Sequence, residues 1–327
     1  MRSGNITLIA LCLCVAVLGL HVGVRAYSSA EVWRAVTGAD TDATAIIIRD
    51  LRVPRMVLAA LVGGALGLAG LMMQSLTRNP VAEPGLLGVN AGAAFAVVVL
   101  LTTVPGASMW AIMAVAAIGA TAAAALVFGL ALSVGAAMSP VHLLLAGVSV
   151  AGLLMAGVQV LVILNEQTLE ELIFWLSGSF VDRPLAGGWL VAVGLAVGAA
   201  LCLAQAPALD ALRADDATAA ALGVDVARLR LGLLAGAAML AGCCVALAGP
   251  IAFVGLVAPH LARLSGARGH GQMIPRTVIF GTLLALSADV LARFLLYPTE
   301  APVSAVMALI GVPVLVALMR GTGLRLA

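Results

Sequence analysis

The residues with the clearest potential for chemistry are the charged ones between positions 210 and 230, because long apolar runs lie on both sides of them. They are Asp210, Arg213, Asp215, Asp216, Asp225, Arg228 and Arg230. An aspartate at 215 or 216 can cap a short alanine-rich helix, since a carboxylate accepts hydrogen bonds from the free amides of a first turn. Gly223 can close that helix in the left-handed conformation, and Asp225 can cap the next one. Two interpretations stay open: a solvated loop, or a compact helical element that docks to a partner.

The basic residues limit the enzymatic chemistry of the chain, because all seventeen are arginine. A P-loop requires a lysine after its second glycine, and Schiff-base catalysis requires a lysine amine. The protease and esterase signatures H-E-x-x-H and G-x-S-x-G do not occur. The five cysteines lie in apolar runs without a C-x-x-C pair, and no two histidines have metal-ligand spacing. We therefore expect no catalytic residue, no metal site and no cofactor in this chain.

Three arginines, Arg52, Arg55 and Arg293, lie at the ends of apolar segments. An arginine in the bilayer costs about 2.5–3.5 kcal/mol on insertion scales, so these side chains should lie near an interface. They could serve as anchors that reach the lipid headgroups, or they could contact a partner. Asp289 and Arg293 are four residues apart, which allows an intrahelical ion pair with a mainly structural role.

The composition predicts an all-α polytopic membrane protein. The 327-residue chain is 63% hydrophobic and 10% charged, whereas a soluble domain is about 45–50% apolar and about 25% charged. About 20 apolar residues span a bilayer. Ten candidate spans follow: Ile6–Val24, Met56–Leu76, Leu86–Val104, Met109–Val134, Val141–Leu164, Leu185–Leu203, Leu229–Leu247, Ile251–Leu264, Val278–Leu296 and Val303–Met319. The apolar segment Leu172–Phe180 is too short to span and suits a surface or re-entrant helix.

The arginines also predict the orientation. With ten spans both termini share one side, and that side receives ten of the seventeen arginines. Because cytoplasmic loops are enriched in arginine and lysine, both termini and the polar stretch are expected in the cytoplasm. The N-terminus also resembles a signal peptide, but the many following spans favour a first transmembrane helix.

One predicted span is interrupted. Pro250, Gly255 and Pro259 indicate a broken helix whose freed carbonyl groups must be satisfied inside the protein. The segment Asn79–Leu87 resembles Gly249–Val257, which is either an inverted repeat, as in many transporters, or a chance similarity. Small residues such as Gly63 and Gly67 favour close helix packing.

Six motifs spread along the chain resemble the permease family of type II ABC importers (FecCD type), whose members carry iron chelates, haem or cobalamin. The motifs are Arg52–Arg55, Gln74–Gly88, Phe174–Ser179, Ala221–Val224, Gly249–Arg263 and Ala288–Pro302. The resemblance covers essentially the whole chain and implies a single transmembrane permease domain over residues 1–327.

The resemblance also implies partners. A second permease subunit, identical or paralogous, would share a central pathway with this one. A dimer of ATPase subunits would bind ATP-Mg below, and a periplasmic or lipoprotein substrate-binding protein would dock outside. The location implied is a bacterial cytoplasmic (inner) membrane, with lipid around the helices and no nucleic acid partner.

Residue roles follow from the same resemblance. The outer arginines Arg52, Arg55 and Arg293 match those that grip the binding protein. Pro250, Gly255 and Pro259 keep a structural role at the helix break. The ATPase-coupling element would be formed by Asp216, Ala220, Leu222, Gly223 and Val224.

The expected cargo is a ferric siderophore, with haem and cobalamin as alternatives within the family. A secondary transporter without an ATPase is the alternative from another class. It should carry coupling carboxylates in mid-membrane, whereas almost every acidic residue here falls in a predicted loop or at a helix end.

Overall fold

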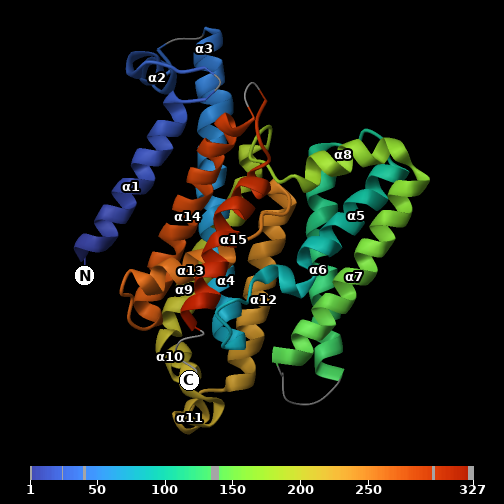
Figure 1. Ribbon diagram of the computed structural model, residues 1–327, viewed down its shortest axis with the longest axis vertical. Coiled ribbons are helices and arrows are strands. Elements are labelled where there is room, and N and C mark those ends of the chain that lie inside the picture. Colours follow the sequence, from blue (N-terminus) through green and yellow to red (C-terminus); the bar gives the residue numbers. More distant parts are fainter. Residues whose placement is uncertain (1, 24, 40–41, 134–139, 297–298, 323–327) are drawn as a thin grey trace.

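The computed structural model describes residues 2–23, 25–39, 42–133, 140–296 and 299–322, and this part of the chain is helical with no strands. The long helices are α1 (Arg2–His21), α4 (Val53–Thr77), α5 (Val89–Thr103), α6 (Met109–Ser133), α7 (Pro140–Leu164), α9 (Gly188–Ala204), α12 (Val226–Ala248), α13 (Val254–Leu264), α14 (His270–Leu295) and α15 (Val303–Thr322). Short helices at one end are α2 (Ser29–Val36), α3 (Ala43–Ile46), the π-helix η1 (Ile47–Arg52) and α8 (Glu166–Leu176), with the 3-10 turn η3 (Leu185–Gly187) before α9. The 3-10 turn η2 (Pro84–Leu87) follows α4, and α10 (Ala206–Ala214) and α11 (Asp216–Ala221) lie at the opposite end (Figure 1).

Six helices are long and apolar enough to cross a membrane: Ala43–Thr77, Met109–Ser133, Val141–Leu164, Leu185–Ala204, Val226–Ala248 and His270–Leu295. Shorter apolar helices lie at Asn5–His21, Val89–Thr103, Val254–Leu264 and Val303–Ala317. Each predicted span overlaps one of these helices, although two predicted span ends, Val24 and Val134, lie outside the described residues. Of the short apolar segment Leu172–Phe180, residues 172–176 lie in the separate helix α8 and residues 177–180 follow it.

Helix α4 forms the centre of the bundle, and α14, α12 and α13 pack around it (Figure 1). Glycines on α4 allow this close packing: a Cβ atom on Gly63 would overlap the carbonyl oxygen of Gly281 in α14, and one on Gly67 would lie 2.9 Å from the carbonyl of Thr277. Gly70 faces the backbone of Gly255 in α13 in the same way. The small residues therefore serve helix packing within the chain, because lipid supplies no hydrophobic force between helices.

We expect Gly70→Ala to destabilise the protein by about 1–3 kcal/mol, because the added methyl group would overlap the Gly255 carbonyl and force α4 and α13 apart. Thermal unfolding in detergent measures the effect. Gly232→Ala is the matched control, since a Cβ atom there meets nothing within 4 Å and alanine is the better helix former. Equal unfolding midpoints for the two variants would contradict this account of α4.

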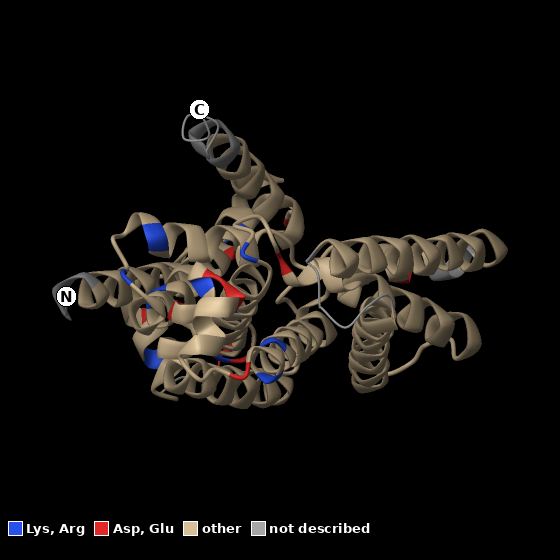
Figure 2. Cartoon of the chain, turned by 90° about the horizontal axis from the view of Figure 1, so that it is seen from below, with Lys and Arg blue, Asp and Glu red and all other residues tan. Residues whose placement is uncertain are grey.

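The helices α5, α6 and α7 carry no Asp, Glu, Lys or Arg, and the charged residues gather on the other part of the molecule (Figure 2). Large apolar side chains of α6 and α7 point outward; Ile118, Leu153 and Ile163 are 68%, 72% and 77% exposed. An apolar outer surface of this kind suits lipid or neighbouring helices rather than water.

The predicted helix break lies at residues 249–253, between the end of α12 and the start of α13. Pro250 is in the break, whereas Gly255 and Pro259 lie inside α13, which corrects their assignment as break residues. Pro259 is tolerated within the helix because its missing N–H frees only the carbonyl of Gly255, and the side-chain amide of Gln74 donates to that carbonyl at 3.4 Å. The prediction that a freed carbonyl is satisfied inside the protein is confirmed.

The two segments that resemble each other in sequence also meet in space. Phe253, which has a left-handed φ of 68°, donates its backbone N–H to the carboxylate of Glu83 at 3.3 Å. A Cβ atom on Gly255 would lie 3.0 Å from Pro84. The contact joins the turn after α4 to the break before α13.

Candidate functional sites at the two ends of the bundle

The polar stretch near residue 215 folds as predicted from its capping residues. Asp215 is the N-cap of α11 and accepts a hydrogen bond from the backbone N–H of Thr218 at 2.6 Å. This bond and one from the Thr218 hydroxyl lower the pKa of the Asp215 carboxyl. Gly223 closes the turn with φ of 82°, and Asp225 caps α12 through the N–H of Arg228 at 3.0 Å. The stretch is an ordered helical element, not an irregular loop.

Salt bridges hold this element against the long helices. Asp216 accepts hydrogen bonds from Arg78, just after α4, and from Arg230 of α12 at 3.0 Å. Arg78 also donates to the carbonyl of Leu212 at 2.8 Å. Sequence reasoning did not assign a role to Arg78 or Arg230, because no sequence spacing relates residue 78 to residue 216. These contacts tie α11 to the end of α4 and to α12.

The tip of the element is open to its surroundings. Ala220, Leu222 and Gly223 are exposed, and Leu222 is 70% exposed although it is a large apolar residue. Val224 is half-buried, and its N–H donates to the carbonyl of Ala219 at 3.0 Å. A capped, apolar and protruding tip is suited to insertion in a groove of a partner.

At the opposite end, charged residues from three segments form a buried network around Asp289, which is 0% exposed. The Asp289 carboxylate accepts hydrogen bonds from Arg55 at 2.6 Å and from Arg293 at 2.7 Å. Arg55 also donates to Glu300 at 2.6 Å. The predicted pairing of Asp289 with Arg293 is confirmed, and the long-range link from Arg55 to both acids was not predicted.

Arg52 and Arg293 are bound mainly to backbone carbonyls. Arg52 donates to Leu20 at 2.8 Å and to Arg25 at 2.6 Å, and its guanidinium lies 4.5 Å from the ring centroid of Tyr27. Arg293 donates to the Gly19 carbonyl at 2.5 Å. All three predicted outer arginines are nearly buried, yet they line one cavity of about 190 Å³, together with Gly23, Ile47, Leu51, Val181, Asp182 and Glu300. Among the described residues, no three His, Cys, Asp or Glu side chains are grouped closely enough to hold a metal ion.

The fold and these two ends define a multi-pass helical membrane protein of the transporter class, and the comparisons agree. The chain belongs to the FecCD transport family, whose profile matches residues 8–321. It is similar to a solved structure described as an inward-facing conformation of a metal-chelate type ABC transporter, with a TM-score of 0.82, 30% identity, and coverage of 97% of this chain and 98% of that one.

Individual relatives are permease proteins of iron-chelate importers. The chain is 40% identical to the ferric enterobactin transport system permease protein of Escherichia coli (strain K12), over 96% of this chain and 93% of the relative. It is 36% identical to the Fe(3+)-citrate import system permease protein of Bacillus subtilis (strain 168), over 96% and 93%. It is also 36% identical to the hemin transport system permease protein of Yersinia pestis, over 94% and 92%.

Proposed function

We propose that this chain is a permease subunit that imports a ferric siderophore in an ATP-driven, binding-protein-dependent system. The single observation that supports this choice of cargo is the 40% identity, over nearly the whole of both chains, to a ferric enterobactin permease. Haem is the alternative cargo, because a hemin permease is 36% identical over a similar length.

The subunit acts as a single permease domain of ten spans in a bacterial inner membrane, with both termini and α11 in the cytoplasm. A second permease subunit, identical or paralogous, completes the pathway. The six long and four shorter apolar helices support this count. A substrate-binding protein docks at the end that carries Arg52, Arg55 and Arg293, and ATP-Mg is bound and hydrolysed by a separate ATPase dimer.

Coupling proceeds through the tip of α11. Ala220, Leu222, Gly223 and Val224 enter a groove of the ATPase, while Asp216 fixes the element to Arg78 and Arg230. ATP-driven closure of the ATPase then moves the element as a rigid body and changes which side of the pathway is open. The exposed apolar tip on a salt-bridged base supports this assignment.

Uptake in cells that lack the gene tests the proposed function. Labelled iron would be supplied as several ferric siderophores and as haem, with labelled cobalamin in parallel. Loss of uptake of one ferric siderophore, restored by the wild-type gene, is the expected result. Loss of haem or cobalamin uptake alone would show that the cargo is that compound and not a ferric siderophore. Unchanged uptake of every compound would contradict the importer role.

We expect Arg52→Glu to weaken docking of the binding protein by at least about tenfold, with a larger effect at low salt. The substitution places a negative charge in the cavity shared with Arg55 and Arg293, where an acidic side chain of the binding protein would enter. Affinity of the purified complex for the binding protein, measured at two salt concentrations, checks the prediction. Arg34→Glu, on α2 at the same end, is the control, and equal affinities for the two variants would count against a docking role for Arg52.

A further inference from the structure

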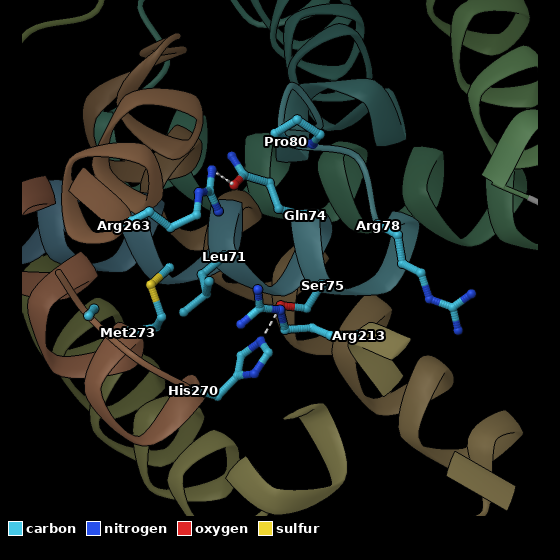
Figure 3. Close-up of a pocket in the computed structure, with 10 residues that line it drawn as sticks. Leu71, Gln74, Ser75, Arg78, Pro80, Arg213, Arg263, His270 and Met273 are labelled. Carbon is cyan, nitrogen blue, oxygen red and sulfur yellow. Dashed lines mark hydrogen bonds between the residues drawn. The ribbon is translucent and has the colours of Figure 1, made fainter. Parts of the chain in front are cut away.

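A basic pocket lies beside the α11 element, and of its lining residues only Arg78 takes part in the coupling proposal. It has a volume of about 260 Å³ and is lined by Leu71, Gln74, Ser75, Arg78, Pro80, Arg213, Arg263, Ala267, His270 and Met273 (Figure 3). Three of these residues are arginines and none is acidic. A water occupies about 30 Å³ in the liquid, so the pocket has room for a phosphate-sized anion and several waters.

Among the residues that the structure describes, Arg263 is held by one side-chain hydrogen bond and keeps its other donors unused. Its guanidinium donates to the side-chain oxygen of Gln74 at 2.8 Å. The Gln74 amide nitrogen is in turn fixed by the carbonyls of Gly255 and Leu256 in α13, at 3.4 Å and 3.3 Å. A guanidinium carries five N–H donors, so the fixed side chain retains donors for a ligand.

Arg213 approaches the same space from α10. In Figure 3 the guanidinium groups of Arg213 and Arg263 both extend toward the space between Gln74 and His270, while Arg78 points away from it. Within the described part of the chain, Arg213 has no hydrogen bond or salt bridge to an acidic side chain. Arg78 is occupied by Asp216 and Leu212, so Arg213 and Arg263 are the two cations directed at the cavity.

The neighbouring acid is already engaged. Asp210 accepts hydrogen bonds from the backbone N–H of His270 at 2.9 Å and from its Nδ1 at 2.7 Å, while Nε2 of the ring meets the Ser75 hydroxyl at 2.9 Å. His270 is buried, at 3% exposed, and these contacts on both ring nitrogens hold it in place as one wall of the pocket. The carboxylate is not part of the pocket lining.

We infer that this pocket binds a phosphate group through Arg213 and Arg263. Two guanidinium forks match the oxygens of a phosphate bidentately, and basic pockets between helices on the cytoplasmic side are typical sites for phosphate headgroups of anionic lipids. The inference relies on the proposed function only for the side of the membrane on which the pocket lies, because that function places α10 and α11 in the cytoplasm. Inorganic phosphate and a phospholipid headgroup share the required chemistry.

Binding of two probes to the full chain tests the inference and separates the sources. Inorganic phosphate would be titrated by calorimetry into the protein in phosphatidylcholine nanodiscs. Retention of phosphatidylglycerol would be followed by native mass spectrometry. Saturable binding of either probe is expected, weakened about ten- to hundredfold in Arg213→Ala, which removes charge-assisted hydrogen bonds. Arg213→Lys should retain part of the affinity, because lysine keeps the positive charge but lacks the planar guanidinium that can bind two phosphate oxygens at once.

Arg228→Ala is the matched control. Its side chain is 89% exposed and lies outside the pocket at the same end of the molecule, so it should leave both affinities unchanged. Arg213 is an exposed residue, and unchanged thermal unfolding of Arg213→Ala without ligand would show that the fold is retained.

Results that contradict phosphate binding can be told apart from results that contradict the proposed transport function. If neither probe binds, or if Arg228→Ala weakens binding as much as Arg213→Ala, the inference is wrong. If neither probe binds and Arg213→Glu instead prevents copurification of the ATPase, the pocket accepts an acidic protein side chain and the inference is also wrong. Uptake measurements report on the transport function independently, because binding is measured without transport.

Discussion

Replacement of Gly223 by leucine is expected to reduce siderophore uptake to the level of cells that lack the gene. A side chain at this position would project from the exposed tip of the coupling element, since a Cβ atom on Gly223 meets nothing within 4 Å inside the chain. Because the space at the Cβ position is open, we expect the added bulk to act mainly where the tip contacts a partner. The ATPase should still hydrolyse ATP if the complex assembles, so transport and hydrolysis become separated.

Backbone strain is the competing explanation, because φ of 82° is unfavourable for any residue with a Cβ atom, at a cost of about 1–2 kcal/mol. Gly223→Ala carries the same strain without the bulk and should retain most of the uptake. Gly266→Leu is a second control: Gly266 has φ of 79° and open space around its Cβ position, and it lies between α13 and α14, away from the tip. Normal uptake in Gly223→Leu, or equal losses in Gly223→Leu and Gly266→Leu, would rule out a specific role for the tip.

Replacement of Asp289 by alanine is expected to destabilise the protein by about 3–5 kcal/mol, the usual cost of removing one partner from a buried ion pair. Asp289 is fully buried and is the acid shared by Arg55 and Arg293. Its loss would leave two guanidinium groups buried near each other, with only Glu300 to compensate Arg55. The Asp289→Asn variant should also be less stable than the wild-type protein. Asparagine keeps the shape of the side chain but removes the negative charge that pairs with the two guanidinium groups.

Thermal unfolding followed by a thiol-reactive dye measures this effect, since Cys12, Cys202 and Cys244 are buried and become reactive on unfolding. A Cys14→Ser background removes an exposed thiol. Asp50→Ala is the control, because the Arg49–Asp50 pair is about half exposed and an exposed pair contributes about 0–1 kcal/mol. A similar small effect for Asp289→Ala would show that the outer network does not stabilise the fold.

Together the two predictions assign different tasks to the two ends of the molecule. The Asp289 network holds α4 and α14 and the carbonyls at the end of α1 together at the end that carries Arg52. The α11 element keeps its tip free and its base fixed at the other end.

Local features of the fold could be predicted from the sequence because their spacing is set by helix geometry. The ten apolar segments, the caps at Asp215 and Asp225, the left-handed Gly223 and the pair between Asp289 and Arg293 all involve residues within one helix or its ends. The absence of lysine likewise excluded a P-loop, and the motifs indicated a transport permease, both without reference to coordinates. The break was only partly predicted, because a proline within a helix is tolerated when a side chain satisfies the freed carbonyl.

The tertiary structure alone decided which distant residues meet. Arg55 and Asp289 are 234 residues apart, and Arg263 and Gln74 are 189 apart. Almost uniformly apolar helices give no pattern that selects the neighbouring helix or its rotation, because every face is compatible with lipid. The buried outer network and the basic pocket beside α10 therefore depend on how α4 packs against α13 and α14, which close approach at Gly63, Gly67 and Gly70 makes possible.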